Sequence, residues 1–197
     1  MNRWKELPIV SGAIVVVNIV VYILCMFTGN RLYRLGSLNV ADVLAGREYG
    51  RIVWAMFLHS GISHIFNNML ILFFMGAMIE KEIGHLCYAL LFFLSGIGGN
   101  LVSLYVKAVN YDMSASVGAS GAVFGLDGVL LAMVLFSGRK MANVTPTRVL
   151  AMILLSLYNG FSAENIDNAA HVGGLVVGFL GGCAVCVIQR GRRSVQR

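Results

Sequence analysis

Two residues far apart in this sequence have side chains that could perform acyl transfer together. Ser120 lies in the run SVGASGAVFG (residues 116–125), and His171 lies in a second glycine-rich segment. A serine hydroxyl is a weak nucleophile until a base within hydrogen-bond reach takes its proton, and histidine is the usual base near neutral pH. If the fold brings them together, Ser120 and His171 would form a nucleophile and its general base.

A second pair of polar residues could stabilise the oxyanion that acyl transfer creates. His64 and Asn68 are one helical turn apart and would share a face of a helix. An imidazole N–H and an amide NH₂ can both donate, and N–H groups at the start of a helix near Ser120 would add donors. The alternative is that His64 and Asn68 only hold neighbouring helices together. For His59 we expect a structural role in bracing the adjoining loop.

Glycines near Ser120 and His171 offer another explanation for the same segments. Stripes of glycine let helix backbones approach closely in a membrane. Such stripes occur on both segments, at Gly121, Gly125, Gly128, Gly174, Gly178 and Gly182. Taken alone, these glycines favour a packing role for Ser120 over a catalytic one. Close contact between the two segments would also be what allows His171 to reach Ser120.

The composition places these segments in a bilayer. Of the 197 residues, 58% are hydrophobic and only 12% are charged, whereas a soluble domain carries roughly 25% charged residues. The mean hydropathy is +0.79. The net charge of +6 is expected to set the orientation in the membrane. No basic patch interleaved with aromatic residues is present, so no nucleic-acid partner is expected.

Six apolar stretches could form membrane-spanning helices, each of which needs about 20 apolar residues. They are residues 7–30, 62–79, 83–106, 117–136, 146–161 and 168–188. Thr145 and Pro146 suit the N-cap and the first position of the fifth helix. Residues 30–51 are polar and basic, which predicts a long loop. We therefore expect an all-α membrane protein, a single domain of residues 1–197 with six transmembrane helices.

The distribution of Lys and Arg predicts the orientation of these helices. Six spans place both termini on one side of the membrane. That side would carry Arg3, Lys5, Lys81, Arg139, Lys140, Arg148, Arg190, Arg192, Arg193 and Arg197, and the other side Arg31, Arg34, Arg47, Arg51 and Lys107. The more basic side, with both termini, is expected to be cytoplasmic. The second, fourth and sixth spans then all begin at the outer face, which places Ser120, His171 and the His64–Asn68 pair at one depth.

Polar residues at membrane depth are costly and are therefore functional-site hypotheses. Asp127 is also of this kind. It lies two helical turns, about 10.5 Å, from Ser120, which is too far to orient His171 directly. We expect its carboxyl group to be protonated or hydrogen-bonded to a neighbouring helix.

Three other chemistries are disfavoured by the residues present. The histidines do not form H-E-x-x-H, and the Cys183–Cys186 pair has no second pair or histidine cluster to complete a zinc site. With Cys25 and Cys87 these cysteines are expected to be buried reduced thiols. Tyr111-Asp112 and Gly125-Leu126-Asp127 partly match the motifs of intramembrane aspartyl proteases, but leucine replaces a required glycine.

The segments discussed so far resemble the rhomboid family of intramembrane serine proteases over nearly the whole chain. The similarity to the family is carried by Gly118-Ala119-Ser120-Gly121, by Ala170-His171-Val172-Gly173-Gly174 with Gly178, by Tyr49-Gly50-Arg51, by MFLHSGISHIFNNM (residues 56–69) and by Glu80. The first two look like the family's Gly-x-Ser-Gly and Ala-His-x-x-Gly-x-x-x-Gly motifs.

The resemblance implies a role for each matching position. Ser120 would be the nucleophile and His171 the general base, a dyad without an acid. His64, Asn68 and the Ser120 backbone N–H would form the oxyanion hole. Gly118 would allow close approach, and Arg51 and Glu80 would be structural. The helix 146–161 and the loop 161–167 would act as gate and cap.

Two positions depart from the family pattern. Gly50 stands where the family often has tryptophan, so we expect weaker anchoring of the first loop in the bilayer. Phe124 stands where many members have a tyrosine beneath the histidine, which keeps the ring and loses the hydroxyl. Neither departure removes a reacting group, so activity is expected.

The resemblance implies cleavage of single-span membrane proteins, within or near their transmembrane helix, without a metal or other cofactor. Substrate helices weakened by Gly or Pro should be preferred, because a helical backbone holds its carbonyl groups in internal bonds. The expected location is a bacterial plasma membrane. A catalytically silent protein that binds transmembrane helices and a six-span transporter are the alternatives.

Overall fold

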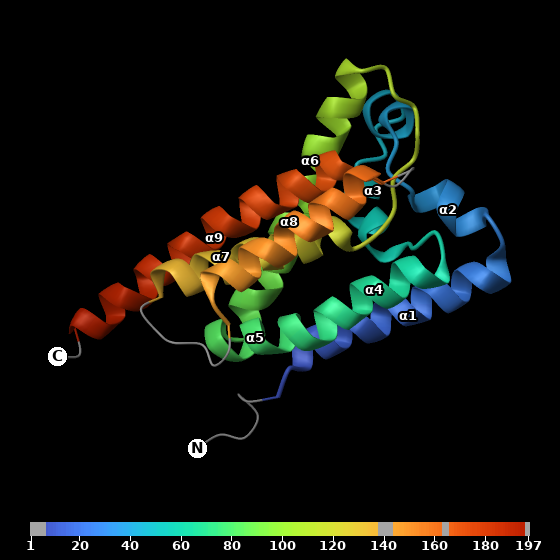
Figure 1. The fold of residues 1–197 in the computed structure, drawn as a ribbon. Coiled ribbons are helices and arrows are strands. Elements are labelled where there is room, and N and C mark those ends of the chain that lie inside the picture. Colours follow the sequence, from blue (N-terminus) through green and yellow to red (C-terminus); the bar gives the residue numbers. More distant parts are fainter. Residues whose placement is uncertain (1–6, 138–143, 163–165, 196–197) are drawn as a thin grey trace.

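The computed structural model describes residues 7–137, 144–162 and 166–195, and these ranges are almost entirely helical (Figure 1). In chain order the elements are α1 (Ile9–Thr28), α2 (Arg31–Gly36), the π-helix η2 (Ala41–Ala45), α3 (Arg51–Trp54), the 3₁₀-helix η3 (Ala55–Phe57), α4 (Ile62–Ile71), the π-helix η4 (Leu72–Gly76), α5 (Ala77–Ile83), α6 (His85–Val109), α7 (Ser120–Phe136), α8 (Pro146–Ser162) and α9 (Asn168–Val195). The expectation of an all-α protein is confirmed.

Four helices among the described residues are long and apolar enough to cross a membrane. They are Ile9–Thr28, Ile62–Ile83, His85–Val109 and Asn168–Gly191, of which the second runs continuously through α4, η4 and α5. α7 and α8 have 17 residues each, about 25 Å of helix, which is short for a span. Helices thus lie at all six predicted positions, although only four meet the criteria of length and composition.

Some of the basic residues used to predict the orientation lie outside the described residues, namely Arg3, Lys5, Arg139, Lys140 and Arg197. In the described part, α1 begins and α9 ends at the same end of the bundle (Figure 1). α6, α7 and α9 pack against one another, α1 packs beside α4 to α5, and α8 packs mainly on α7. At the start of α8, Arg148 N–H donates to Thr145 Oγ1 at 3.3 Å, which confirms the predicted cap.

The segment 30–51, predicted as a loop, instead holds α2 and η2 and leads into α3. A small apolar cluster stabilises it, formed by Leu38, Val40, Val43, Ala55 and Leu104. Arg51 is buried and contacts three parts of the segment: Asp42 at 3.0 Å, Glu48 at 2.6 Å and the Ser37 carbonyl at 3.0 Å. The segment was mispredicted because its helices are too short to show a periodic pattern and because the apolar cluster that holds them includes Leu104 of α6.

Glu80, in the first turn of α5, fixes the start of α1. Its carboxylate is 1% exposed and accepts bonds from Val10 N–H, Ser11 N–H and Ser11 Oγ, each at 2.8 Å. His85 Nδ1 lies 2.5 Å from Oε1, the carboxylate oxygen that also accepts the bond from Val10 N–H. Because the first N–H groups of a helix have no intrahelical acceptor, Glu80 caps α1 from a neighbouring helix.

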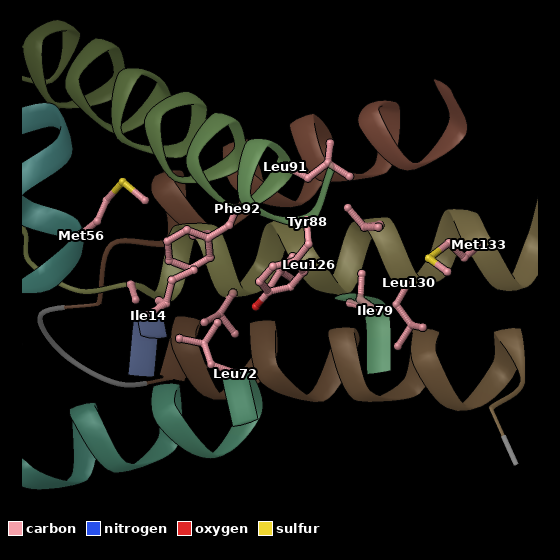
Figure 2. Packing of buried hydrophobic residues seen from close by; sticks show 14 of the residues in the cluster. Ile14, Met56, Leu72, Ile79, Tyr88, Leu91, Phe92, Leu126, Leu130 and Met133 are labelled. Atoms are coloured by element: carbon pink, nitrogen blue, oxygen red, sulfur yellow. The ribbon is translucent and has the colours of Figure 1, made fainter. Parts of the chain in front are cut away.

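The apolar core lies between α6, α7 and the α4–α5 helix (Figure 2). Tyr88 and Phe92 project from α6 and are fully buried, as are Leu72, Ile79 and Leu126 from the facing helices. Large hydrophobic residues on the outer surface of the bundle remain exposed, including Phe27, Leu86 and Leu180. An apolar exterior of this kind fits a lipid surrounding.

The backbones of α7 and α9 approach each other closely. A Cβ added at Gly174 would overlap the carbonyl of Gly121, and one added at Gly178 would overlap the carbonyl of Gly125. Only glycine at positions 174 and 178 permits this short distance between the two helix backbones, which agrees with the close packing that the glycine stripes predicted. The start of α9 is thereby held directly against the start of α7.

Substitution of Gly178 by alanine should therefore force α9 away from α7. The overlap with the Gly125 backbone is expected to lower the free energy of unfolding by about 1–3 kcal/mol. Thermal unfolding in detergent measures this change. The matched control is Gly12→Ala in α1, where no atom lies within 4 Å of the added Cβ; its Tm should stay the same or rise. Equal Tm values for the two variants would contradict the packing described.

Candidate active site

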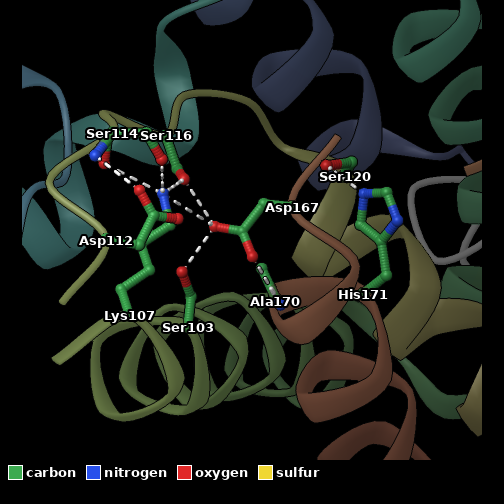
Figure 3. Close-up of polar contacts among 9 residues, drawn as sticks. All are labelled: Ser103, Lys107, Asp112, Ser114, Ser116, Ser120, Asp167, Ala170 and His171. Atoms are coloured by element: carbon green, nitrogen blue, oxygen red, sulfur yellow. Dashed lines mark hydrogen bonds and ion pairs between the residues drawn. The ribbon is translucent and has the colours of Figure 1, made fainter. Parts of the chain in front are cut away.

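The packing of α9 on α7 places Ser120 and His171 face to face (Figure 3). Ser120 is the first residue of α7, and His171 lies in the first turn of α9. The distance from Ser120 Oγ to His171 Nε2 is 2.9 Å, which suits a hydrogen bond donated by the hydroxyl. His171 is buried, whereas Ser120 is partly exposed. When Nε2 accepts this bond, the imidazole hydrogen resides on Nδ1.

The His171 ring is oriented by packing. Phe124, one turn after Ser120, stacks on it with ring centroids 4.3 Å apart and an interplanar angle of 16°. His171 Nδ1 is buried and has no hydrogen-bond partner within the described residues. The phenylalanine at this position therefore keeps the ring contact expected beneath the histidine.

Asp127 lies in α7, two helical turns beyond Ser120. Its side chain is buried in the helix bundle and is 2% exposed. Its Oδ1 atom has no hydrogen-bond partner in the part of the chain that the structure describes. Asp112, in contrast, is exposed in the loop before α7. The two aspartates occupy different environments, as the predicted topology implied.

Gly118 and His64 border the space in front of Ser120. Gly118 has a φ of +131°, a conformation that other residues rarely adopt. A Cβ at Gly118 would lie 2.7 Å from His64 Cε1 and Nε2 and 3.6 Å from Ser120 Oγ. Glycine thus leaves open a position between the serine hydroxyl and the His64 ring. His64 Nδ1 lies 3.2 Å from Ser60 Oγ, so a bond donated by Ser60 would leave the hydrogen on Nε2, facing this space.

Two further donors belong to the same region. Asn68 follows His64 by one turn of α4, and its Nδ2 is buried without a hydrogen-bond partner among the described residues. A buried donor of this kind is uncommon in proteins. Ser120 contributes its backbone N–H at the first turn of α7, where N–H groups lack an intrahelical acceptor.

His59 braces the chain immediately before Ser120. It is fully buried, and its Nε2 accepts a bond from Ala119 N–H at 3.5 Å. Its ring centroid lies 5.0 Å from that of His64, and its carbonyl accepts from Tyr33 Oη at 2.5 Å. Burial, followed by the proximity of His64, lowers the pKa of His59 to about 4. With this pKa, His59 is neutral at pH 7 where it contacts the chain before Ser120, and its structural role stays a prediction.

Other residues proposed from the sequence lie elsewhere. Arg51 forms its ion pair with Asp42 within residues 30–51, and Glu80 caps the start of α1. Neither contact involves Ser120. Cys25, Cys87, Cys183 and Cys186 form no disulfide in the described structure, and two of them are buried and two half-buried. Of the predicted cap, residues 163–165 lie outside the described residues.

A polar cluster beside the site was missed by the sequence analysis: Ser103, Lys107, Ser116 and Asp167 (Figure 3). Asp167 Oδ2 accepts bonds from Ser103 Oγ and, at 2.5 Å, from Ser116 Oγ. Lys107 Nζ donates to Ser116 Oγ at 2.5 Å and lies 3.7 Å from Asp167 Oδ2. Asp167 also caps α9 through Ala170 N–H at 3.0 Å. An aspartate just before an expected helix is a capping signal, but its contacts with α6 cannot be read from sequence.

The contacts of Asp167 determine its ionisation. Burial by itself would raise its pKa, but the bonds from Ser103, Ser116 and the Ala170 N–H and the charge of Lys107 outweigh burial. The pKa of Asp167 is therefore lower than its ordinary value. The carboxylate is charged at neutral pH, and the three hydrogen-bond donors and the Lys107 ammonium group stabilise this charge.

Comparisons with known proteins give one consistent result. A model of the Rhomboid domain matches residues 46–188. RHOMBOID-like protein 4 of Arabidopsis thaliana is 35% identical over 158 residues, 79% of this chain and 39% of that protein. RHOMBOID-like protein 1 of the same plant is 38% identical over 76% of this chain and 38% of its own length. Rhomboid protease GluP of Bacillus subtilis is 33% identical over 73% of this chain and 27% of its own length. The chain thus spans between about a quarter and two fifths of these relatives.

The ionisation of Asp167 predicts how stability depends on pH. Because its folded-state pKa is lowered, its contribution to the free energy of unfolding is complete above the ordinary pKa of about 3.9 and is lost as the pH falls through the folded-state value. The difference in Tm between wild type and Asp167→Asn, measured in detergent, should be constant from neutral pH to about pH 5 and shrink below about pH 4. If the Tm difference between wild type and Asp167→Asn is as large at the lowest pH as at pH 7, the charge of Asp167 contributes nothing to the free energy of unfolding.

Proposed function

Because the chain belongs to the rhomboid family, we propose that it is an intramembrane serine endopeptidase that uses Ser120 and His171 as a catalytic dyad. The family membership and the apolar helices make it a membrane protein of a protease family. The proposal for the dyad is carried by one observation, the 2.9 Å separation of Ser120 Oγ and His171 Nε2 at the meeting point of α7 and α9.

The reaction follows from this geometry. Ser120 Oγ attacks the carbonyl carbon of the scissile peptide bond while His171 Nε2 takes its proton. The C–N bond then breaks, and the leaving amine receives that proton from Nε2. Water attacks the resulting ester with His171 again as the base, and hydrolysis releases the second product and restores Ser120. Stacking on Phe124 holds the imidazole in position through both steps.

The developing oxyanion would occupy the space that Gly118 leaves open. His64 Nε2 borders this space, and Asn68 Nδ2 is a buried donor that lacks a protein acceptor in the described structure. Together with the Ser120 backbone N–H they form the proposed oxyanion hole. Donors already in place cost no reorganisation during the reaction and are typically worth about 3–4 kcal/mol each.

The substrates proposed are single-span membrane proteins, cleaved in or near their transmembrane segment at its outer end. We further propose six spans with both termini in the cytoplasm of a bacterium and the site toward the outer face. The start of α1 and the end of α9 on the same end of the bundle support this arrangement, as does the excess of Lys and Arg on that side. Helix α8 and the loop that follows it are proposed as gate and cap.

A fluorophosphonate probe tests the dyad. Purified protein in detergent should be labelled at Ser120, and Ser120→Ala should not be labelled. His171→Ala should lower the labelling rate by about 10³-fold or more, because nucleophile and base act as a unit. Ser114→Ala, which removes an exposed serine hydroxyl outside the site, is the control and should react as wild type does.

Two outcomes would contradict this assignment. If Ser120→Ala is labelled as well as wild type, the nucleophile is wrong. If folded wild type is not labelled at all, the chain fits a silent rhomboid-like protein that binds transmembrane helices.

A further inference from the structure

A second hydrogen bond lies beside the Ser120–His171 pair and joins two residues with the same separation in sequence (Figure 3). Ser116 Oγ donates to Asp167 Oδ2 at 2.5 Å, and the two residues are 51 positions apart. Ser120 and His171 are also 51 positions apart. Each member of the outer pair therefore precedes the corresponding member of the inner pair by four residues. The two bonds join the same two segments at adjacent points.

Ser116 is fixed in position by its backbone as well as its hydroxyl. Its N–H donates to the Leu38 carbonyl at 2.8 Å, and its carbonyl accepts from Leu38 N–H at 2.9 Å. This isolated bridge ties the chain before α7 to the segment between α2 and η2. The carbonyl of Ser37 in that segment accepts a bond from the buried Arg51. Ser116 is thus held in a braced segment and is not part of a free loop.

Asp167 is fixed from α6 and α9. Ser103 Oγ of α6 donates to its Oδ2 atom, and the Ala170 N–H of α9 donates to its Oδ1 atom. Its backbone carbonyl accepts from the His171 N–H at 3.2 Å. Lys107 of α6, itself buried, lies near both Ser116 and Asp167 and balances the carboxylate charge. The carboxylate therefore connects three segments, one of which carries His171.

We propose that Ser116 and Asp167 are positioning residues, whose hydrogen bond sets the separation of Ser120 and His171. This inference rests on the proposed function. No side chain in the described structure holds His171 Nδ1, so the position of the imidazole depends on where the first turn of α9 lies relative to the start of α7. The Ser116–Asp167 bond fixes the position of the first turn of α9 relative to the start of α7. It lies before the first residues of both helices, beyond the glycines at which the two backbones touch.

The labelling rate of Ser120 by a fluorophosphonate, resolved into a maximal rate and a half-saturating probe concentration, measures this positioning. A displacement of about 1 Å at a reacting pair can cost about a hundredfold in rate. Ser116→Ala and Asp167→Asn are therefore expected to lower the maximal rate by roughly tenfold to a hundredfold. The half-saturating concentration should change by less than about threefold, because neither side chain is proposed to contact the probe.

Matched variants separate positioning from a general loss of structure. Asparagine at position 167 can still cap α9, so Asp167→Asn tests the hydrogen bond between Ser116 and Asp167 in particular. Ser114→Ala is the control for Ser116→Ala, since Ser114 contacts Lys107 without contacting Asp167. Asp112→Asn is the control for Asp167→Asn. Both controls should label at the wild-type rate, and Ser116→Thr, which keeps the hydroxyl, should recover most of it.

The double variant Ser116→Ala with Asp167→Asn provides the decisive comparison. If the two residues act through one bond, the double variant should label within about threefold of the slower single variant. Independent losses would multiply. Tm is recorded for every variant, and if Asp167→Asn does not fold, Ser116→Ala, which leaves the cap of α9 in place, decides alone.

Each result has one meaning. Slow labelling in both single variants with a non-multiplicative double variant supports the inference. Normal labelling of Ser116→Ala, or multiplicative losses, would overturn it while leaving the dyad intact. Failure of wild type to label would overturn the proposed function itself, and the inference with it.

Discussion

The close approach of α9 to α7 determines where the site residues of both helices lie. In a bilayer, lipid tails are as apolar as the helix surfaces, so burial of apolar side chains gives helices little reason to associate, and close packing has to supply the attraction. Glycines at 121, 125, 174 and 178 allow contact at the level of the backbone. The same contact brings the first turn of α9 to the first residue of α7, where Ser120 and His171 meet. The glycine stripes that first suggested packing are therefore also the condition for the proposed chemistry.

The proposed dyad includes no acid to orient its histidine, and the structure offers three other contacts that could do so. Phe124 stacks on the ring, Asp167 caps the helix that carries it, and Ser116 connects that cap to the chain before the serine. Through the Leu38 bridge and the Ser37 carbonyl, these contacts reach Arg51 and the segment after α1. A segment that could be taken for a passive loop is thus joined by hydrogen bonds to the site.

The sequence predicted the features that depend on local pattern and failed where distant contacts decide. The positions of the helices found at the six predicted spans follow from apolar runs and end signals such as Thr145 and Pro146. The separation of His64 and Asn68 by one turn follows from helix geometry. The helices within residues 30–51 were missed, because Arg51 and the small apolar cluster hold them by tertiary contacts. Asp167 was missed because its bonds come from α6 and from the chain before α7.

Cleavage of a membrane substrate would show directly whether the protein is a protease with Ser120 as its nucleophile. Wild-type protein and Ser120→Ala are reconstituted in liposomes with a single-span model substrate whose transmembrane segment contains Gly or Pro near its outer end, and the products are identified by mass spectrometry. If Ser120 is the nucleophile, wild type should cut within or next to that segment and Ser120→Ala should not. A cut made equally well by Ser120→Ala, or no cut by a folded wild type that labels at Ser120, would contradict the proposed function.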